Sequence, residues 1–229
     1  MIRIYKKPHF LRWLTPNLVW KINTDEKIIY LTFDDGPVPG LTEYVLAELK
    51  KYNASATFFC VGENIKKHAN ICYKIIEDGH LLGNHTYNHL KGCSTKNHEY
   101  FMNIDKCQHE IDKYQQTQFK PLFRPPYGQI TNKQIHFIKE KYEIIMWDML
   151  TYDYEIKLAT PKRLYKIFTK TSSGTIIVFH DNYKGEKNLR YFLPRYLEHF
   201  KEKGFDTDQA TVDSFIAGCM KKYNKKFWK

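Results

Sequence analysis

The sequence predicts a parallel α/β fold, in which short buried strands alternate with longer amphipathic helices. Three observations predict it. Apolar runs of strand length recur between segments with helical periodicity. Gly79, Gly174 and Gly204 each fall just before an expected strand, two of them as helix C-caps. Polar side chains gather where the strands end. An open doubly wound sheet and a closed barrel both fit this alternation.

Seven strands are expected, taken from the apolar runs in chain order. They are Ile28–Phe33, Ala56–Val61, His80–Asn84, Pro121–Arg124, Glu143–Asp148, Thr175–His180 and a weak strand at Phe205–Thr207.

The expected helices lie between these strands and are recognised by their periodicity. They cover residues 41–52, 64–78, 97–116, 131–141, 160–171 and 189–203. Segment 97–116 shows the pattern well, because Tyr100, Ile104 and Ile111 fall on one apolar stripe.

Length and composition indicate one globular domain of 229 residues with 42% hydrophobic residues. We expect residues 1–26 to dock on the main domain, 27–207 to form that α/β domain, and 208–229 to be a basic extension. The formal net charge is +11, but the lysines are spread along the chain without a nucleic-acid-binding motif. We therefore expect no specific nucleic-acid partner.

The cellular compartment is predicted from features that the sequence lacks. The five cysteines form no Cys-x-x-Cys pair, and residues 1–20 lack the continuous apolar stretch of a signal peptide. No segment reaches transmembrane length. These features favour the cytoplasm, with an extracytoplasmic location by another export route as the alternative. The oligomeric state is left open.

Chemically active side chains follow several of the expected strands. The positions are Asp34, Asp35, His85, Arg124, Asp148, Asp153 and His180. In a β/α barrel the carboxyl ends of the strands meet on one face, where active sites are built. We therefore expect residues nearly 150 positions apart to converge on one pocket.

A metal centre is predicted from Asp34-Asp35-Gly36-Pro37 and from the two histidines His85 and His89. Two imidazoles and one carboxylate make a three-ligand site that leaves a position open for water. The second carboxylate is then free to act as a base. Taken alone, the first motif also fits a simple turn, and the second fits two rings on one helical face. Each motif supplies what the other lacks.

Two further segments gain meaning from that site. Arg124-Pro125-Pro126-Tyr127 is stiffened by its prolines, which leave the Tyr127 N–H as one of few free donors. The Arg124 guanidinium is placed to clamp the base carboxylate, although a rigid loop with a surface arginine also fits. His180 ends a buried strand, where a histidine more often has a structural role. It becomes a candidate acid because the ends of the other strands already carry chemically active residues.

These motifs resemble the polysaccharide deacetylases with a NodB homology domain, the fourth carbohydrate esterase family. The patterns at 32–37, 85–89, 124–127 and 178–180 occur in the order of the family, and the resemblance spans roughly Lys27 to Phe205. It implies an irregular, TIM-like (β/α)7 barrel that removes acetyl groups from an acetylated saccharide.

The resemblance also implies roles for individual residues. Asp35, His85 and His89 would hold one divalent metal ion, with zinc expected and cobalt, nickel or manganese as alternatives. Asp34 would be the general base, paired with Arg124.

The remaining implied roles concern the acetyl group and the leaving amine. Tyr127 would donate its backbone N–H to the oxyanion, and His180, oriented by Asp153, would be the general acid. Pro126 and Tyr154 would contact substrate.

This chain departs from the family pattern after the fifth strand. Leu150 replaces an aspartate, and Tyr154 replaces the tryptophan that lines the acetyl pocket. A metal-dependent amidase on a small non-carbohydrate amide and a non-catalytic glycan-binding relative remain the alternatives.

Overall fold

The computed structural model describes residues 4–6 and 13–224. Its centre is one sheet of eight strands whose paired neighbours all run parallel, in the order β1-β6-β5-β4-β3-β2-β8-β7. The strands are β1 Leu18–Val19, β2 Ile29–Asp34, β3 Ala56–Cys60, β4 Leu81–Asn84, β5 Leu122–Phe123, β6 Glu143–Ile145, β7 Met149–Leu150 and β8 Thr175–His180.

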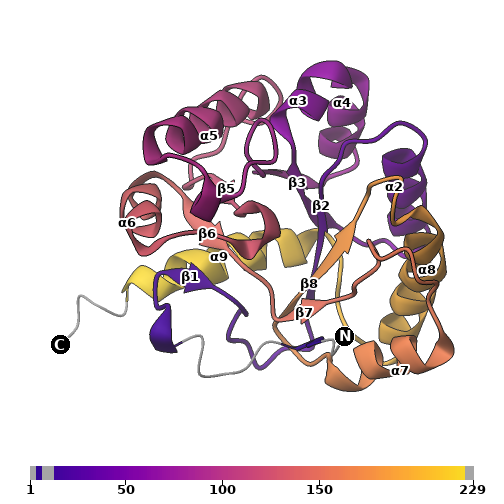
Figure 1. Ribbon diagram of the computed structural model, residues 1–229. Helices are drawn as coiled ribbons and strands as arrows, with labels where there is room; N and C mark the ends of the chain where they lie inside the picture. The colour runs from indigo at the N-terminus through magenta and orange to yellow at the C-terminus, as the bar shows by residue number, and fades with distance from the viewer. Residues whose placement is uncertain (1–3, 7–12, 225–229) are drawn as a thin grey trace.

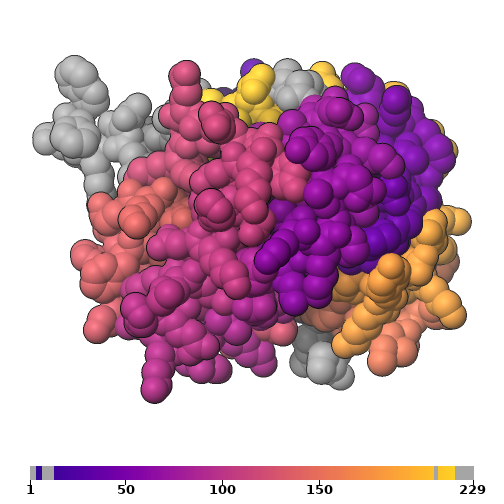
Figure 2. Space-filling model, turned by 90° about the horizontal axis from the view of Figure 1, so that it is seen from above, coloured from indigo at the N-terminus to yellow at the C-terminus, as the bar shows by residue number. Residues whose placement is uncertain are grey.

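Helices surround this sheet (Figure 1). They are α2 Leu41–Lys51, α3 Gly62–Lys67, α4 Ala69–Glu77, α5 Asn97–Ile111, α6 Asn132–Lys141, α7 Pro161–Lys170, α8 Glu186–Glu202 and α9 Gln209–Asn224, with short 3-10 turns at Gly92–Ser94 and Pro126–Gly128. Seen from above, the segments that contain α3, α4 and α5 pack closely over one side (Figure 2). None of the helices within the described residues is long and apolar enough to cross a membrane.

The sheet curls into the predicted irregular barrel because β6, next to one edge strand, and β7, at the other edge, are consecutive in the chain. β6 pairs with β5 and β7 pairs with β8, yet only residues 146–148 separate β6 from β7. The Met146 N–H donates to Val19 O, and the Asp148 N–H donates to Ile176 O, so this link is itself hydrogen-bonded on both sides. The expected single strand Glu143–Asp148 is therefore wrong, because the chain changes partner in its middle.

Other predicted elements also need correction. Residues 205–207 form no strand but a single bridge between Ile28 and Asp206. The expected helix 64–78 is two helices, interrupted at His68, whose ψ of 51° lies outside the helical range. The 97–116 helix ends at Ile111, and α8 begins at Glu186, before the predicted start at 189.

Side chains on each strand alternate between the barrel interior and the helices. In β2, Ile29, Leu31 and Phe33 pack in the large outer cluster with α2 and α8, whereas Tyr30 belongs to an inner cluster. The next interior position of β2 is Thr32, and Asp34 follows at the open end. This alternation places Asp34 at the mouth of the barrel.

The amino end of the barrel is closed by α9 and by the segment before β2. Phe215 is 1% exposed and lies against the ring of Tyr30, with ring centroids 5.1 Å apart. Ile22 and Cys219 belong to the same buried cluster. In Figure 1, α9 passes behind the strands. The division of the chain at 27 and 207 stays a proposal, and both flanking segments contribute to the buried core.

Candidate active site

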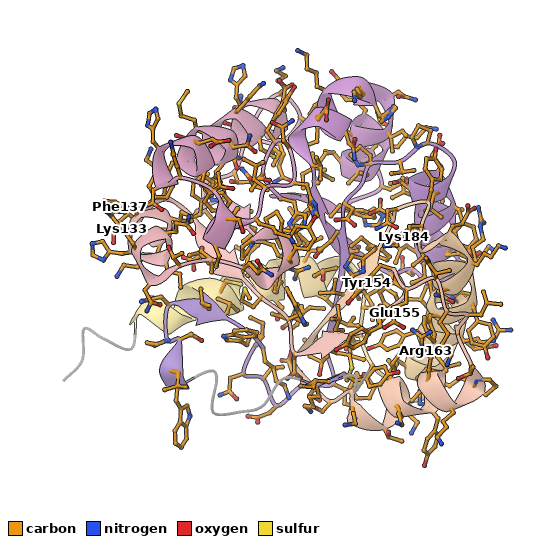
Figure 3. All side chains as sticks on the ribbon, viewed as in Figure 1. Lys133, Phe137, Tyr154, Glu155, Arg163 and Lys184 are labelled. Atoms are coloured by element: carbon orange, nitrogen blue, oxygen red, sulfur yellow. The ribbon has the colours of Figure 1, made fainter. Side chains whose placement is uncertain are left out.

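A cleft of about 470 Å³ opens at the carboxyl ends of the strands. Most of the predicted site residues line it, and the lining comes from five separate segments of the chain. The lining residues are Asp34, Asp35, His85, His89, Tyr127, Trp147, Leu150, Tyr154, Val178, His180, Asn182 and Lys184. Tyr154 and Lys184 are labelled in Figure 3 near the end of β8.

Asp35, His85 and His89 form the candidate metal centre. Their nearest ligand atoms all lie within 4.8 Å of one another. Asp35 Oδ1 is 3.2 Å from His89 Nε2 and 3.7 Å from His85 Nε2. Ligand atoms about 2.1 Å from one tetrahedral zinc ion lie roughly 3.3 Å apart. The two distances therefore fit an ion held by one oxygen and two ring nitrogens.

The two histidines converge through an irregular loop and do not share a helical face. Thr86 and His89 both have positive φ, 61° and 56°. The Asn84 side chain accepts a hydrogen bond from the Thr86 N–H at 3.0 Å, which fixes the start of the loop. The alternative of two rings on one helix is therefore wrong for this segment.

His85 is prepared to be a ligand. Its Nδ1 lies 2.7 Å from the Arg124 carbonyl oxygen, which can only accept, so Nδ1 carries the proton. Burial lowers the pKa of His85 to about 4. The ring is therefore neutral at physiological pH, with the Nε2 lone pair facing Asp35.

Asp35 presents its carboxylate from a left-handed backbone conformation with φ 84°. Its carbonyl oxygen accepts from Asn64 Nδ2 at 2.8 Å, and its Oδ2 accepts from Asn182 Nδ2 at 2.5 Å. Burial by itself raises the pKa of Asp35, but the hydrogen bond from His89 and the neighbouring imidazoles outweigh it and hold the pKa well below its usual value. The carboxylate is therefore charged and available for a cation.

Asp34 faces a different partner from Asp35, as expected for adjacent residues at a strand end. Arg124 Nη1 donates to Asp34 Oδ1 at 2.6 Å and to Thr32 Oγ1 at 2.8 Å. Arg124 is fully buried, so it is no surface residue. Its remaining nitrogens donate to Ile145 O and Met146 O. No hydrogen bond to Asp34 Oδ2 comes from the described residues, which leaves that oxygen facing the cleft.

His180 is paired with the buried carboxylate of Asp153. The distance from His180 Nδ1 to Asp153 Oδ1 is 2.7 Å, and the His180 backbone N–H donates to Asp153 Oδ2 at 2.8 Å. Burial lowers the pKa of His180, but the Asp153 carboxylate outweighs it and raises the pKa to about 9. The imidazole is therefore protonated at neutral pH, with Nε2 left to give a proton.

The three other predicted residues lie at different depths. Tyr127 has φ 59°, and its ring lies tilted against that of His89, with the ring centroids 4.7 Å apart. Its backbone N–H has no acceptor among the described residues. Tyr154 lines the cleft with its ring 4.8 Å from that of His180. Pro126 is buried in the 3-10 turn and is not among the residues that line the cleft.

Asp148 does not reach the site. Its Oδ2 accepts from Thr175 Oγ1 at 3.2 Å, beside the first residue of β8 and far along the strand from His180. The expectation that Asp148 shares the catalytic face is wrong, because β7 begins after it and pairs lower on β8.

Sequence reasoning missed Asp181, which anchors the turn after Asp35. Its carboxylate accepts from the Gly36 N–H at 3.1 Å and from Thr42 Oγ1 at 2.5 Å. A Cβ at position 36 would lie 2.1 Å from Asp181 Oδ2, so only glycine fits there. The sequence shows an aspartate directly after His180. No motif or spacing indicates that its side chain contacts the Asp-Asp-Gly-Pro turn.

Two buried polar side chains that the sequence did not reveal hold the loop that carries Asp153 and Tyr154. Asn188 Nδ2 donates to the carbonyl oxygens of Asp153, Glu155 and Lys157. Arg163 donates to the carbonyl oxygens of Tyr152, Lys157 and Leu158.

Arg163 also lies 3.7 Å from a carboxylate oxygen of Glu155, and both residues are labelled in Figure 3. Side chains of α7 and α8 therefore hold the loop that carries Asp153 and Tyr154, although this loop has no regular secondary structure.

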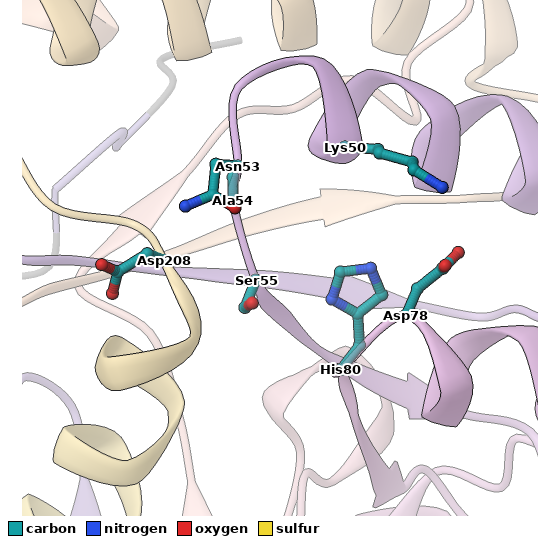
Figure 4. Close-up of a pocket in the computed structure, with 7 residues that line it drawn as sticks. All are labelled: Lys50, Asn53, Ala54, Ser55, Asp78, His80 and Asp208. Carbon is teal, nitrogen blue, oxygen red and sulfur yellow. The ribbon is translucent and has the colours of Figure 1, made fainter.

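A second hollow lies at the opposite, amino end of the strands (Figure 4). It is lined by Lys50, Asn53, Ala54, Ser55, Asp78, His80 and Asp208. His80 Nδ1 accepts from the Ala56 N–H, and burial lowers the pKa of His80 to about 4. His80 thus accepts a hydrogen bond from the backbone at the start of β3 and has a structural role. We therefore place the active site in the cleft at the carboxyl ends of the strands.

Comparison with known proteins supplies the family. The sequence profile described as polysaccharide deacetylase matches residues 21–144, more than half of the chain. The chain belongs to the polysaccharide deacetylase family. It is therefore an enzyme of the hydrolase class, and the barrel and cleft are those of a family member.

Similar proteins include peptidoglycan deacetylases. A peptidoglycan-N-acetylglucosamine deacetylase of Bacillus cereus is 29% identical over 195 residues, which cover 83% of this chain and 90% of the relative. PgdA of Listeria monocytogenes is 33% identical over 84% of this chain, but the match covers only 39% of that longer protein. A crystal structure of the Bc1960 peptidoglycan N-acetylglucosamine deacetylase superposes with a TM-score of 0.79 at 28% identity, covering 87% of this chain and 92% of that one.

Proposed function

We propose that this protein is a metal-dependent hydrolase that removes N-acetyl groups from amino sugars of a peptidoglycan-type glycan. The observation that carries the proposal is the placement of Asp34, with one free oxygen, directly beside the Asp35, His85 and His89 cluster. A base next to a three-ligand metal centre is the arrangement that hydrolysis by activated water requires.

The residues of the chain divide the work. A divalent ion held by the three ligands would lower the pKa of water and polarise the acetyl carbonyl. Asp34 accepts a proton from the attacking water through its free oxygen, while Arg124 holds the other oxygen. The Tyr127 N–H, which has no partner among the described residues, donates to the carbonyl oxygen as it gains charge. His180 gives its proton to the departing amine, and Asp153 keeps that imidazole protonated between turnovers.

The substrate class is inferred from the relatives and from the charge of the cleft. Two cationic side chains are among the described lining residues, the His180 imidazolium, which is paired with Asp153, and Lys184, for which no ion pair is found in the described part of the chain. Peptidoglycan carries carboxylates, on the peptides attached to its muramic acid units or on the lactyl groups of units without a peptide, and an ammonium attracts them, whereas chitin is neutral. Tyr154 and Leu150 form an apolar wall against which the acetyl methyl group fits.

The test separates metal binding from proton transfer. Asp34→Asn should keep metal affinity within a few-fold of the parent while losing about 10²- to 10⁴-fold in turnover, the usual contribution of a general base. His85→Ala should lose both. Metal affinity is measured by calorimetric titration and turnover by released acetate from peptidoglycan. Full activity of Asp34→Asn, or parental metal binding by His85→Ala, would refute the assignment.

Substrate choice decides between the glycan and the small-amide alternative. Acetate release is compared for peptidoglycan fragments, chito-oligosaccharides and simple acetylated amines under the same metal loading. We expect the fragments to be preferred. A preference for the simple amides would favour an amidase, and no turnover of any substrate would favour a glycan-binding relative.

A further inference from the structure

Asn182 lines the cleft beside the candidate metal centre and contacts the Asp35 carboxylate. Its Nδ2 donates to Asp35 Oδ2 at 2.5 Å, while Asp35 Oδ1 faces His85 and His89. The two carboxylate oxygens are thus differentiated, one by an amide and the other by two ring nitrogens.

The orientation of the Asn182 amide is fixed by a group that can only donate. The Gly185 backbone N–H lies 3.0 Å from Asn182 Oδ1, so this end of the amide must be the oxygen. The nitrogen end then points at Asp35. Gly185 packs closely against the loop that carries Asp153, since a Cβ at position 185 would lie 3.0 Å from Asp153 O. The backbone N–H that orients the amide is therefore itself held in place.

Coordination geometry gives this hydrogen bond a consequence. A carboxylate can bind a cation through one oxygen or through both. If both oxygens of Asp35 bound, the second would take a position that the substrate water needs. An N–H that donates to Oδ2 occupies a lone pair of this oxygen and favours metal binding through Oδ1 alone.

We propose that Asn182 is a positioning residue that makes Asp35 a one-oxygen metal ligand. The inference rests on the proposed function, because it assumes that the cluster of Asp35, His85 and His89 holds the metal. It goes further in naming the group that sets the ligand's orientation, a residue outside the segments 32–37, 85–89, 124–127 and 178–180.

Two variants remove the amide in different ways. Asn182→Ala leaves space, and Asn182→Leu fills it without a donor. The Gly185 N–H keeps a second acceptor in both, because it also lies 3.1 Å from the backbone carbonyl of residue 182. Asn132→Ala, an exposed asparagine at the start of α6, is the matched control.

Metal affinity and metal geometry are the readouts. The chelator-treated proteins are titrated with Co²⁺ by calorimetry, and the visible spectrum of the Co²⁺-loaded proteins is recorded. Loss of an outer hydrogen bond to a ligand weakens metal binding by about 10- to 100-fold. We expect that loss in both Asn182 variants, together with a changed Co²⁺ spectrum, and parental values in Asn132→Ala. Melting curves of the metal-free proteins show whether each variant is folded. If Asn182→Ala is not folded, the Co²⁺ titration of Asn182→Leu decides the test.

The outcomes separate this inference from the function on which it rests. Co²⁺ affinity of the Asn182 variants within twofold of the parent, with an unchanged spectrum, would overturn the positioning role. Asp35→Ala is titrated alongside. If it also binds Co²⁺ as the parent does, the metal centre itself is wrong. If it loses Co²⁺ while the Asn182 variants do not, only the positioning role fails.

Discussion

At the scale of single residues, the site consists of charged groups held by specific partners in a buried setting. Arg124 neutralises Asp34, and Asp153 neutralises His180, each at hydrogen-bond distance. A buried charge without such a partner is strongly destabilising. The pairs therefore fix the positions of the charged groups, and the raised pKa of His180 makes the pH dependence of the enzyme predictable.

The pH profile should report His180. Its raised pKa of about 9 means that the acid form is present below that pH and is lost as the pH rises through it. Activity should therefore fall above about pH 9. In Asp153→Asn the carboxylate that raises the pKa is gone, so the fall should move to lower pH by at least about one unit. Initial rates of acetate release between pH 6 and 10.5 give both profiles.

Glu155→Gln is the control for this prediction, since it removes a nearby carboxylate that lies 3.7 Å from Arg163. A basic limb that stays in place in Asp153→Asn would show that another group is the acid.

At the scale of elements, the loop between β7 and α7 depends on helices for its shape. Residues 151–160 have no regular helix or strand, yet they carry Asp153 and Tyr154. Asn188 in α8 and Arg163 in α7 bind its backbone carbonyls, and the Ala159 N–H donates to Asn188 Oδ1 at 2.6 Å. The helices thus satisfy backbone groups that would otherwise be buried without partners.

Asn188→Ala should loosen this loop. It removes the shared donor of three carbonyls, and an unsatisfied buried polar group costs about 1–3 kcal/mol. We expect faster amide hydrogen exchange across 152–160 and a lower turnover, measured by mass spectrometry and acetate release. Lys187→Ala, an exposed neighbour in α8, is the control. Unchanged exchange in this loop would contradict the role of Asn188.

At the scale of the whole molecule, the two ends of the barrel have separate tasks. The carboxyl end holds the polar cleft, and the amino end is filled by Tyr30, Ile176 and Phe215 from different segments. Tyr30 and Asp34 lie on the same strand four residues apart, roughly 13 Å. Stability and chemistry are therefore separable by mutation.

Phe215→Ala tests that separation. Removing a buried phenylalanine costs about 3–5 kcal/mol of unfolding free energy because it leaves a cavity. Urea denaturation measures this loss. Metal affinity at a temperature where the variant is folded should stay at the parental value. A stability change below about 1 kcal/mol would mean that α9 is a dispensable extension, as the division at 207 allows.

The sequence by itself determined the alternation of strands and helices and the residue types at the strand ends. These follow from local periodicity and from the rule that parallel strands present their carboxyl ends on one face. Asp34, Asp35, His85, His89, Arg124 and His180 were identified as site residues from the sequence. The structure places all of them on one cleft except Arg124, which is buried and hydrogen-bonded to Asp34.

Tertiary structure alone decided what depends on contacts between distant segments. The change of partner between β6 and β7 displaced Asp148, because strand pairing is set by the closure of the barrel and not by the apolar run. Asn182 and Asn188 gained their tasks from groups 147 and 35 residues away, Asp35 and Asp153. A hydrogen bond of this kind leaves no periodic trace in the sequence, since it needs only one donor and one acceptor that folding places within reach.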